Sequence, residues 1–175
     1  MNTLSQFLVE LRNVHLVAAN HVMTYLKGTI YCGFSYDGDH DFTLSGYTDV
    51  DWAGSVSDRK STSGCCFSLG SAMILWLSRK QSSIALSTVE AEYIAACFAS
   101  CEAIWLRKLL TCLFDLEMRA TAILCENQSC IKMTENPVFH DRSKHIEIRY
   151  HFIRDMVQRG ALKLQYISTD EQVAE

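Results

Sequence analysis

The chain has 175 residues, of which 49% are hydrophobic and 21% are charged, and this is the composition of an ordinary globular domain. Its 16 lysines and arginines against 20 aspartates and glutamates give a net charge of −4, which excludes a protein that coats nucleic acid by bulk positive charge. The eight cysteines include no Cys-x-x-Cys pair, so their spacing predicts reduced thiols rather than a zinc site or a disulfide framework. We see neither a secretory leader nor an apolar membrane span, and we expect a soluble intracellular protein.

A helix and a run of strands are predicted in the first half of the chain. Apolar residues recur at spacings of three and four between residues 13 and 27, which is typical of an amphipathic helix. Residues 30–36 form a candidate strand, and three further strands are expected at 42–49, 65–69 and 72–77. Gly70-Ser71 separates the last two, and glycine tolerates the positive φ of a tight hairpin turn. The three consecutive strands are therefore predicted to form an antiparallel meander.

The second half of the chain alternates between helices and strands. Ser87-Thr88-Val89-Glu90 is a capping box that predicts the start of a long helix. Further elements are expected as a strand at 120–125, helices at 127–136 and 143–159, and a last strand at 161–167. Three strands before the alternation favour a mixed sheet in an α/β domain. The tryptophans at positions 52, 76 and 105 are predicted to be core residues, because two of them lie in apolar stripes.

Three carboxylates stand at the ends of predicted strands or near the start of a helix: Asp49, Glu92 and Glu126. If the first and fourth strands of the sheet are neighbours, Asp49 and Glu126 emerge side by side, and the capped helix can bring Glu92 over them. Several carboxylate oxygens at one sheet edge are what magnesium or manganese prefers. One alternative is a set of solvated acidic caps, which are common at such positions. Another is a carboxylate pair for glycoside hydrolysis, although nothing nearby indicates a sugar cleft.

Six stretches of the chain carry a resemblance to a known family. They are YTDVDWAG at 47–54, DRKSTSG at 58–64, ALSTVEAEY at 85–93, ENQS at 126–129, NPVFH at 136–140 and KHIEIRYHFIR at 144–154. In this order they resemble the ribonuclease H domain of the Pol polyprotein of copia-type LTR retrotransposons (Pseudoviridae). On this resemblance, residues 1–40 are the end of the reverse transcriptase connection, a helix plus a strand. Residues 41–175 are then a ribonuclease H-like domain whose C-terminal helix is truncated.

The resemblance implies a ribonuclease H-like α/β fold, in which a five-stranded mixed sheet with its first three strands antiparallel carries helices on both faces. It implies endonucleolytic hydrolysis of the RNA strand of RNA–DNA hybrids by a two-metal mechanism, as part of retrotransposon reverse transcription. The cofactors would be two Mg²⁺ or Mn²⁺ ions. The catalytic and metal-binding residues implied by motif position are Asp49, Glu92, Glu126 and Glu175, and Glu90 is then mainly a helix cap.

The chain departs from the family pattern at two of these four positions. The family has aspartate at the third and fourth positions, whereas this chain has Glu126 and Glu175. The chain also stops where family members continue into a C-terminal helix. Because magnesium demands near-octahedral geometry, a longer side chain at two ligand positions is expected to impair activity. The alternative function is therefore a catalytically inactive, retroelement-derived domain that binds nucleic acid or a protein partner.

Basic residues near the predicted site are candidates for phosphate contacts, in spite of the negative net charge. The candidate nucleic-acid-binding residues are Arg59, Lys60, Arg142, Lys144 and Arg149, and the alternative for them is an ordinary solvated surface. The expected partners are an RNA–DNA hybrid and, in the polyprotein, an upstream reverse transcriptase domain. We expect no membrane association, a monomer when the domain is isolated, and a cytoplasmic location (a virus-like particle in the family) or a nuclear one.

Overall fold

The structure is a computed structural model that describes residues 2–5, 7–36, 42–115, 118–135 and 152–174. The chain divides into two compact units, Met1–Ser35 and Tyr36–Glu175, and each is described by itself. The prediction that the first part is a polymerase connection stays a prediction. Within the described residues, no helix is long and apolar enough to cross a membrane.

The first unit holds α1 (Asn2–Ser5) and α2 (Asn13–Gly28). Helix α2 confirms the amphipathic helix, but none of its side chains is buried. The apolar stripe is largely open, as shown by Val14, which is 67% exposed. The strand predicted at 30–36 is wrong, because these residues have no strand structure. A strand needs a neighbour for its backbone hydrogen bonds, and the described part of this unit offers none.

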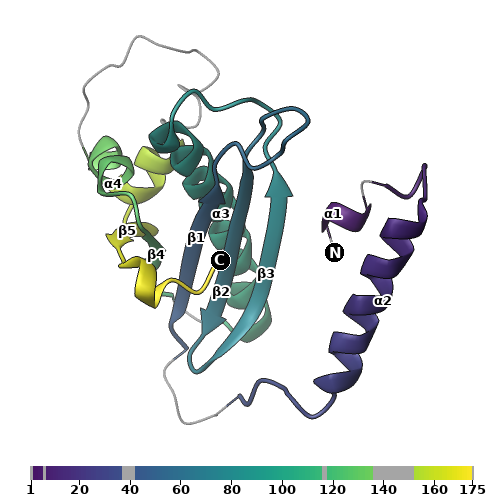
Figure 1. The fold of residues 1–175 in the computed structure, drawn as a ribbon. Coiled ribbons are helices and arrows are strands. Elements are labelled where there is room, and N and C mark those ends of the chain that lie inside the picture. Colours follow the sequence, from purple (N-terminus) through teal and green to yellow (C-terminus); the bar gives the residue numbers. More distant parts are fainter. Residues whose placement is uncertain (1, 6, 37–41, 116–117, 136–151, 175) are drawn as a thin grey trace. The chain divides into compact units, whose positions relative to one another are not determined.

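The second unit is built on a five-stranded sheet in the order β3-β2-β1-β4-β5 (Figure 1). Its strands are β1 (Leu44–Asp51), β2 (Thr62–Leu69), β3 (Ala72–Lys80), β4 (Thr121–Cys125) and β5 (Leu162–Tyr166). The first three strands pair antiparallel, and β4 runs parallel to both β1 and β5. The predicted mixed sheet with an antiparallel meander is therefore confirmed. Gly70 takes a φ of +59° in the turn between β2 and β3, as the hairpin prediction requires.

Helix α3 (Thr88–Phe114) forms the core with one face of this sheet. Its small residues Ala99 and Ala103 are fully buried in a cluster with Phe67 and Ile123 of the sheet. The predicted cap at Ser87 is confirmed, since its side chain accepts a hydrogen bond from the Glu90 amide at 3.2 Å. The Glu90 carboxylate, however, accepts from the Leu86 amide, one residue before the position that a capping box uses.

A shorter helix, α4 (Gln128–Glu135), contacts α3 and therefore lies on the same side of the sheet. It confirms the helix predicted at 127–136. Of the helix predicted at 143–159, residues 152–158 are helical, and residues up to 151 lie outside the described part of the chain. Ile153 from this segment is fully buried in a second cluster, together with Tyr93 of α3 and Cys130 of α4.

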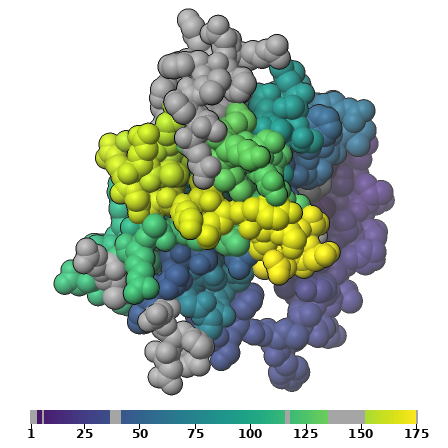
Figure 2. Space-filling model, turned by 90° about the vertical axis from the view of Figure 1, so that its left-hand side faces the viewer, coloured from purple at the N-terminus to yellow at the C-terminus, as the bar shows by residue number. Residues whose placement is uncertain are grey.

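The last described residues follow a 3₁₀ turn, η1 (Thr169–Glu171), and pack against strands β1 and β2. Figure 2 shows them in yellow as a band across the surface below α4. The Gln172 amide donates to the Thr48 carbonyl at 3.1 Å. A Cβ added at Gly64 would lie 2.9 Å from the Ala174 carbonyl oxygen. Because its neighbour Cys65 is buried in the core with α3, Gly64 faces the opposite side of the sheet, and Ala174 covers it there.

The prediction that all three tryptophans are core residues is wrong. Trp52 is 46% exposed, Trp76 66% and Trp105 53%. Trp76 is in the edge strand β3 and pairs with Cys66 of β2, so it lies on the face of the sheet away from Cys65 and α3. The buried positions of α3 nearest to Trp105 are Ala103, Leu106 and Leu110, so Trp105 lies beside the buried stripe rather than in it. Because apolar residues occur all around this helix, its sequence does not show which face packs against the sheet.

Gly46 in β1 is expected to be required for packing, and Gly46→Ala tests this. A Cβ at this position would lie 2.5 Å from the ring of Phe67, which is fully buried. Because the ring is enclosed, we expect the added methyl to lower the free energy of unfolding by about 1–3 kcal/mol, the usual cost of overpacking. Urea denaturation measures this, with Ser45→Ala on the other face of β1 as the control. Equal unfolding free energies for Gly46→Ala and the wild type would contradict the prediction.

Candidate active site

The pairing of β1 with β4 brings two of the predicted carboxylates together. The two strands are parallel, with Tyr47 opposite Leu124. Continuing this register by two residues places Asp49 opposite Glu126, which follows the last residue of β4. Since parallel strands end at the same edge of a sheet, both side chains leave that edge. The hypothesis that the first and fourth strands are neighbours is therefore confirmed.

Glu92 reaches the same place from the start of α3. The buried side chain of Gln81, which follows β3, ties this helix to the sheet. Its Nε2 donates to the Ser63 hydroxyl at 2.9 Å and to the Ala91 carbonyl at 3.0 Å. Ala91 precedes Glu92, and Ser63 pairs with Val50, the residue after Asp49. Gln81 therefore fixes the distance between the helix and the strand that carry these two carboxylates.

The three carboxylates repel one another electrostatically. Burial, with further contributions from the Asp49 and Glu126 charges, raises the pKa of Glu92 to about 7. The pKa of Asp49 is also raised, chiefly by burial and less by the Glu126 and Asp51 charges, against the opposing hydrogen bond from the Val50 amide. Raised pKa values in a cluster of acids are typical of functional sites. A bound cation would relieve this repulsion.

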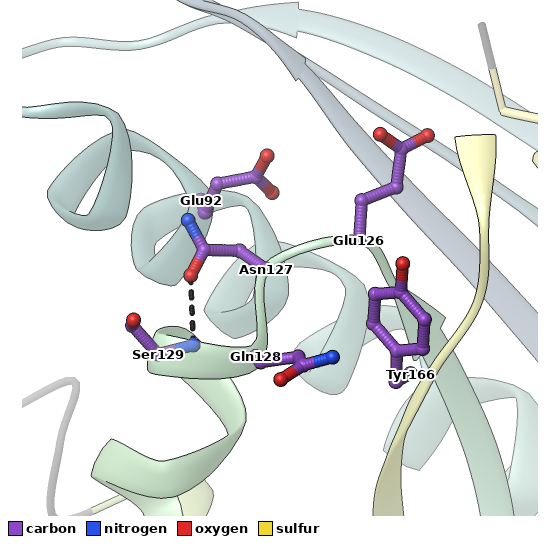
Figure 3. Close-up of a pocket in the computed structure, with 6 residues that line it drawn as sticks. All are labelled: Glu92, Glu126, Asn127, Gln128, Ser129 and Tyr166. Atoms are coloured by element: carbon purple, nitrogen blue, oxygen red, sulfur yellow. Dashed lines mark hydrogen bonds between the residues drawn. The ribbon is translucent and has the colours of Figure 1, made fainter.

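An open pocket of about 430 Å³ lies beside Glu92 and Glu126, and its other lining residues are Asn127, Gln128, Ser129 and Tyr166. Figure 3 shows the two carboxylates extending past the loop that carries Asn127, with Tyr166 beside Glu126. The Asn127 side chain accepts hydrogen bonds from the Ser129 and Cys130 amides at 2.9 and 3.1 Å. It therefore caps α4 and holds the loop after β4 in place.

The donor set of this site fits a hard divalent cation. Glu92 Oε2 and Glu126 Oε1 are buried and have no hydrogen-bond partner among the described residues, which is costly for a carboxylate oxygen unless something else satisfies it. Oxygen ligands of this kind are those that Mg²⁺ and Mn²⁺ take. As the described side chains are placed, no three histidine, cysteine or acidic groups stand close enough to hold one ion. A site for a metal would thus need these side chains to close around it.

The remaining predicted site residues are only partly described. Glu175, Arg142, Lys144 and Arg149 lie outside the described residues. The backbone of Ala174 lies against Gly64, which pairs with Asp49, so the chain immediately before position 175 is held beside the strand that carries Asp49. The fourth ligand stays a prediction.

Arg59 and Lys60 lie on the loop between β1 and β2, which leaves the sheet at the edge where Asp49 lies. Arg59 has a left-handed backbone with a φ of 52°, and its amide donates to the Ser55 carbonyl at 2.8 Å. Asp58, the nearest acid in sequence, is paired instead with Lys80, at 2.9 Å between Oδ1 and Nζ. The charges of Arg59 and Lys60 are therefore not neutralised by Asp58.

Sequence reasoning missed Gln81 and Tyr166 as parts of this site. Gln81 is a polar residue directly after an apolar hairpin strand, and this position could have marked it as a candidate. Only the fold shows that its side chain is buried. Tyr166 ends β5, the strand parallel to β4. The general rule that ligands bind at the carboxyl ends of parallel strands could have indicated it.

Solved structures with this arrangement define the class of fold. The second unit is similar to a ribonuclease H1 isolated from compost, with a TM-score of 0.53, 13% identity, and coverage of 75% of this chain and 88% of that one. It is equally similar to the N-terminal RNase H domain of a Mycobacterium tuberculosis protein, with a TM-score of 0.53, 12% identity, and coverage of 75% and 86%. A prototype foamy virus protease-reverse transcriptase matches with a TM-score of 0.52 and 12% identity over 76% of this chain and 18% of that one. The fold is that of ribonuclease H.

Sequence relatives of the chain include segments of retrotransposon polyproteins. The whole chain is 40% identical to 13% of a retrovirus-related Pol polyprotein from transposon TNT 1-94 of Nicotiana tabacum. It is 41% identical to 12% of the Pol polyprotein from transposon RE1 of Arabidopsis thaliana. A secreted RxLR effector protein of Plasmopara viticola is 41% identical over 61% of this chain and 75% of its own length. No protein-family model matches. The whole chain is therefore similar to one segment of the retrovirus-related Pol polyproteins of plant transposons, and it spans about an eighth of the first two relatives' length.

Proposed function

We propose that this chain is the ribonuclease H domain of a copia-type retrotransposon and hydrolyses the RNA strand of RNA–DNA hybrids endonucleolytically. One observation carries the proposal. Asp49, Glu92 and Glu126 come from three separate elements of a ribonuclease H fold and converge at one sheet edge, where two of them have raised pKa values and two buried carboxylate oxygens lack a hydrogen-bond partner among the described residues. Such an edge suits phosphodiester hydrolysis assisted by Mg²⁺ or Mn²⁺.

The carboxylates act together in this proposal. Asp49, near the end of the central strand β1, would hold the divalent ions together with Glu92, Glu126 and, as a fourth ligand, Glu175. When bound, the ions supply an activated water and stabilise the departing oxygen, which leaves a 3′-hydroxyl and a 5′-phosphate. Without the ions, Glu92 with its pKa of about 7 holds a proton through the mildly acidic range.

The substrate would be recognised by shape and charge. Arg59 and Lys60 would contact phosphates from the loop after β1, since neither is neutralised by Asp58. Arg142, Lys144 and Arg149 would extend these contacts. Discrimination against DNA duplexes would rest on the A-form-like hybrid and the 2′-hydroxyls of its RNA strand. The domain would act beside an upstream reverse transcriptase in a cytoplasmic particle or in the nucleus, and would be monomeric when isolated.

Cleavage of a labelled RNA–DNA hybrid by the purified chain tests the proposal. We expect RNA-strand cleavage with Mn²⁺ and slower cleavage with Mg²⁺, because manganese is more tolerant of imperfect geometry. Chelation of the metal should abolish the activity. Single-stranded RNA, RNA duplex and DNA duplex are the controls and should stay intact. A chain that binds hybrid but cuts nothing with either metal would contradict the nuclease proposal.

The second candidate is a catalytically inactive domain that binds nucleic acid or a protein partner. The observation in its favour is that the described acids, as placed, leave no three groups close enough for one ion. Glutamate at position 126 instead of the family's aspartate points the same way. Retained hybrid binding together with a complete lack of divalent-cation affinity would identify this function.

A further inference from the structure

The Glu126 carboxylate is held by a residue that the proposed mechanism does not use. Its Oε2 accepts a hydrogen bond from the Thr169 hydroxyl at 3.0 Å. Its other oxygen, Oε1, is buried and has no partner among the described residues. One side of the carboxylate is therefore anchored to the protein, and the other is left available to a ligand.

The backbone brings the two residues to the same edge of the sheet. Strands β4 and β5 are parallel with Cys125 opposite Tyr166, and the Ile167 amide donates to the Cys125 carbonyl at 3.1 Å. Glu126 and the segment leading to Thr169 thus leave the two strands together. Thr169 begins η1, and its carbonyl accepts from the Gln172 amide at 3.1 Å. The hydroxyl is therefore presented from a fixed turn.

We propose that Thr169 is a positioning residue for the metal site: its hydroxyl holds Glu126 Oε2 so that Oε1 points toward a divalent cation. This inference rests on the proposed function. The contact with Thr169 would also explain why position 126 is a glutamate. An aspartate here is one methylene shorter and would not span the distance to Thr169 from the same backbone. The longer side chain and the threonine form a matched pair, and Glu126 is a supported ligand rather than a misplaced one.

Hydrogen bonds from outside the ligand set commonly tune a metal site, and their loss typically weakens metal affinity about 10–100-fold. Thr169→Val keeps the shape of the side chain and removes the donor, whereas Thr169→Ser keeps the donor. Thr169 is exposed, so neither change is expected to prevent folding. Thr43→Val, at the opposite end of β1, is a matched control for the same exchange on an exposed threonine.

The test measures Mn²⁺ affinity from the electron paramagnetic resonance signal of free Mn²⁺, on the full chain. We expect Thr169→Val to weaken binding about tenfold, and Thr169→Ser and Thr43→Val to bind like the wild type. In the Glu126→Asp background, Thr169→Val should have no further effect, because the contact is already lost. Equal Mn²⁺ affinity of the wild type and Thr169→Val, or the same loss in both backgrounds, would overturn the inference.

Melting temperatures without metal separate this inference from the proposed function. The contact predicts that Thr169→Val lowers the melting temperature of the wild type but not that of Glu126→Asp. If the wild type binds no Mn²⁺, the proposed nuclease function fails, and so does a metal role for Thr169. If the wild type binds Mn²⁺ and the melting temperatures show no coupling between positions 126 and 169, the positioning role alone is overturned.

Discussion

Asp49→Asn is expected to abolish hybrid cleavage while leaving the fold intact. Asparagine keeps the shape of the side chain and removes its charge, so the exchange tests the carboxylate as a ligand. Asp49 lies near the end of the central strand β1, which pairs with β2 and β4, and in the proposed function it is a direct ligand of the metal. Loss of a supporting hydrogen bond around a metal costs about 10–100-fold, and we expect the loss of a direct ligand to exceed about a hundredfold. Initial rates of hybrid cleavage with Mn²⁺ measure the effect.

Asp115→Asn is the matched control for this exchange. Asp115 follows α3 in a left-handed conformation with a φ of 51°, which asparagine also adopts readily. Its variant should fold and cut like the wild type. Circular dichroism and the melting temperature must show that Asp49→Asn is folded. Cleavage by folded Asp49→Asn at the wild-type rate would show that Asp49 is not a ligand.

Glu92→Gln is expected to stabilise the metal-free protein at pH 8 but not at pH 4. The pKa of Glu92 is about 7 in the folded protein against an ordinary value of 4.5. Between pH 4.5 and pH 7, Glu92 is therefore protonated in the folded chain and deprotonated in the unfolded chain. The stability that this proton provides is complete below pH 4.5 and is lost as the pH rises through 7. Glutamine carries no charge at any pH and so avoids this loss.

The expected gain at pH 8 is about 1–2 kcal/mol in the free energy of unfolding, after allowance for solvent screening of a partly exposed side chain. Urea denaturation in the presence of a chelator at pH 4 and pH 8 measures it. Glu102→Gln, on the same helix but away from the site, is the control for the loss of one negative charge. With Mn²⁺ at pH 8 the order should reverse, because only the wild type gains stability from binding the ion. A difference between Glu92→Gln and the wild type that does not change with pH would contradict the prediction.

Much of the site could be predicted because it depends on strand ends. Asp49 and Glu126 each follow a run of strand-forming residues, and two parallel neighbours must end together. The only unknown was whether the first and fourth strands pair, and the register of Tyr47 with Leu124 answers it. Helix α3 could also be predicted, because the Ser87 cap and the long apolar run after it both indicate a helix that begins at this point.

Other features depend on contacts between distant residues, which local patterns do not encode. Gln81 is polar and follows a strand, so its sequence environment indicates a loop, yet it is buried and joins β2 to α3. The contact of Thr169 with Glu126 depends on the pairing of β4 with β5. The candidate strand at 30–36 had the right composition but no neighbour to pair with among the described residues of its unit. In each case the tertiary partner decided the outcome.

The parallel pairing of β1 with β4 also sets the order in which the chain can become functional. The meander of β1, β2 and β3 joins neighbouring segments through short connections, whereas β4 can pair with β1 only after the long helix α3 has crossed between them. Contacts between distant segments form at a larger entropic cost and slow folding. During synthesis, Asp49 emerges well before Glu126 because it comes earlier in the chain. The two carboxylates can come together only after β4 has been made and has paired with β1. In the proposed function, divalent-cation binding would report the docking of β4 onto β1, and a nascent chain that has folded only its first three strands would lack the site.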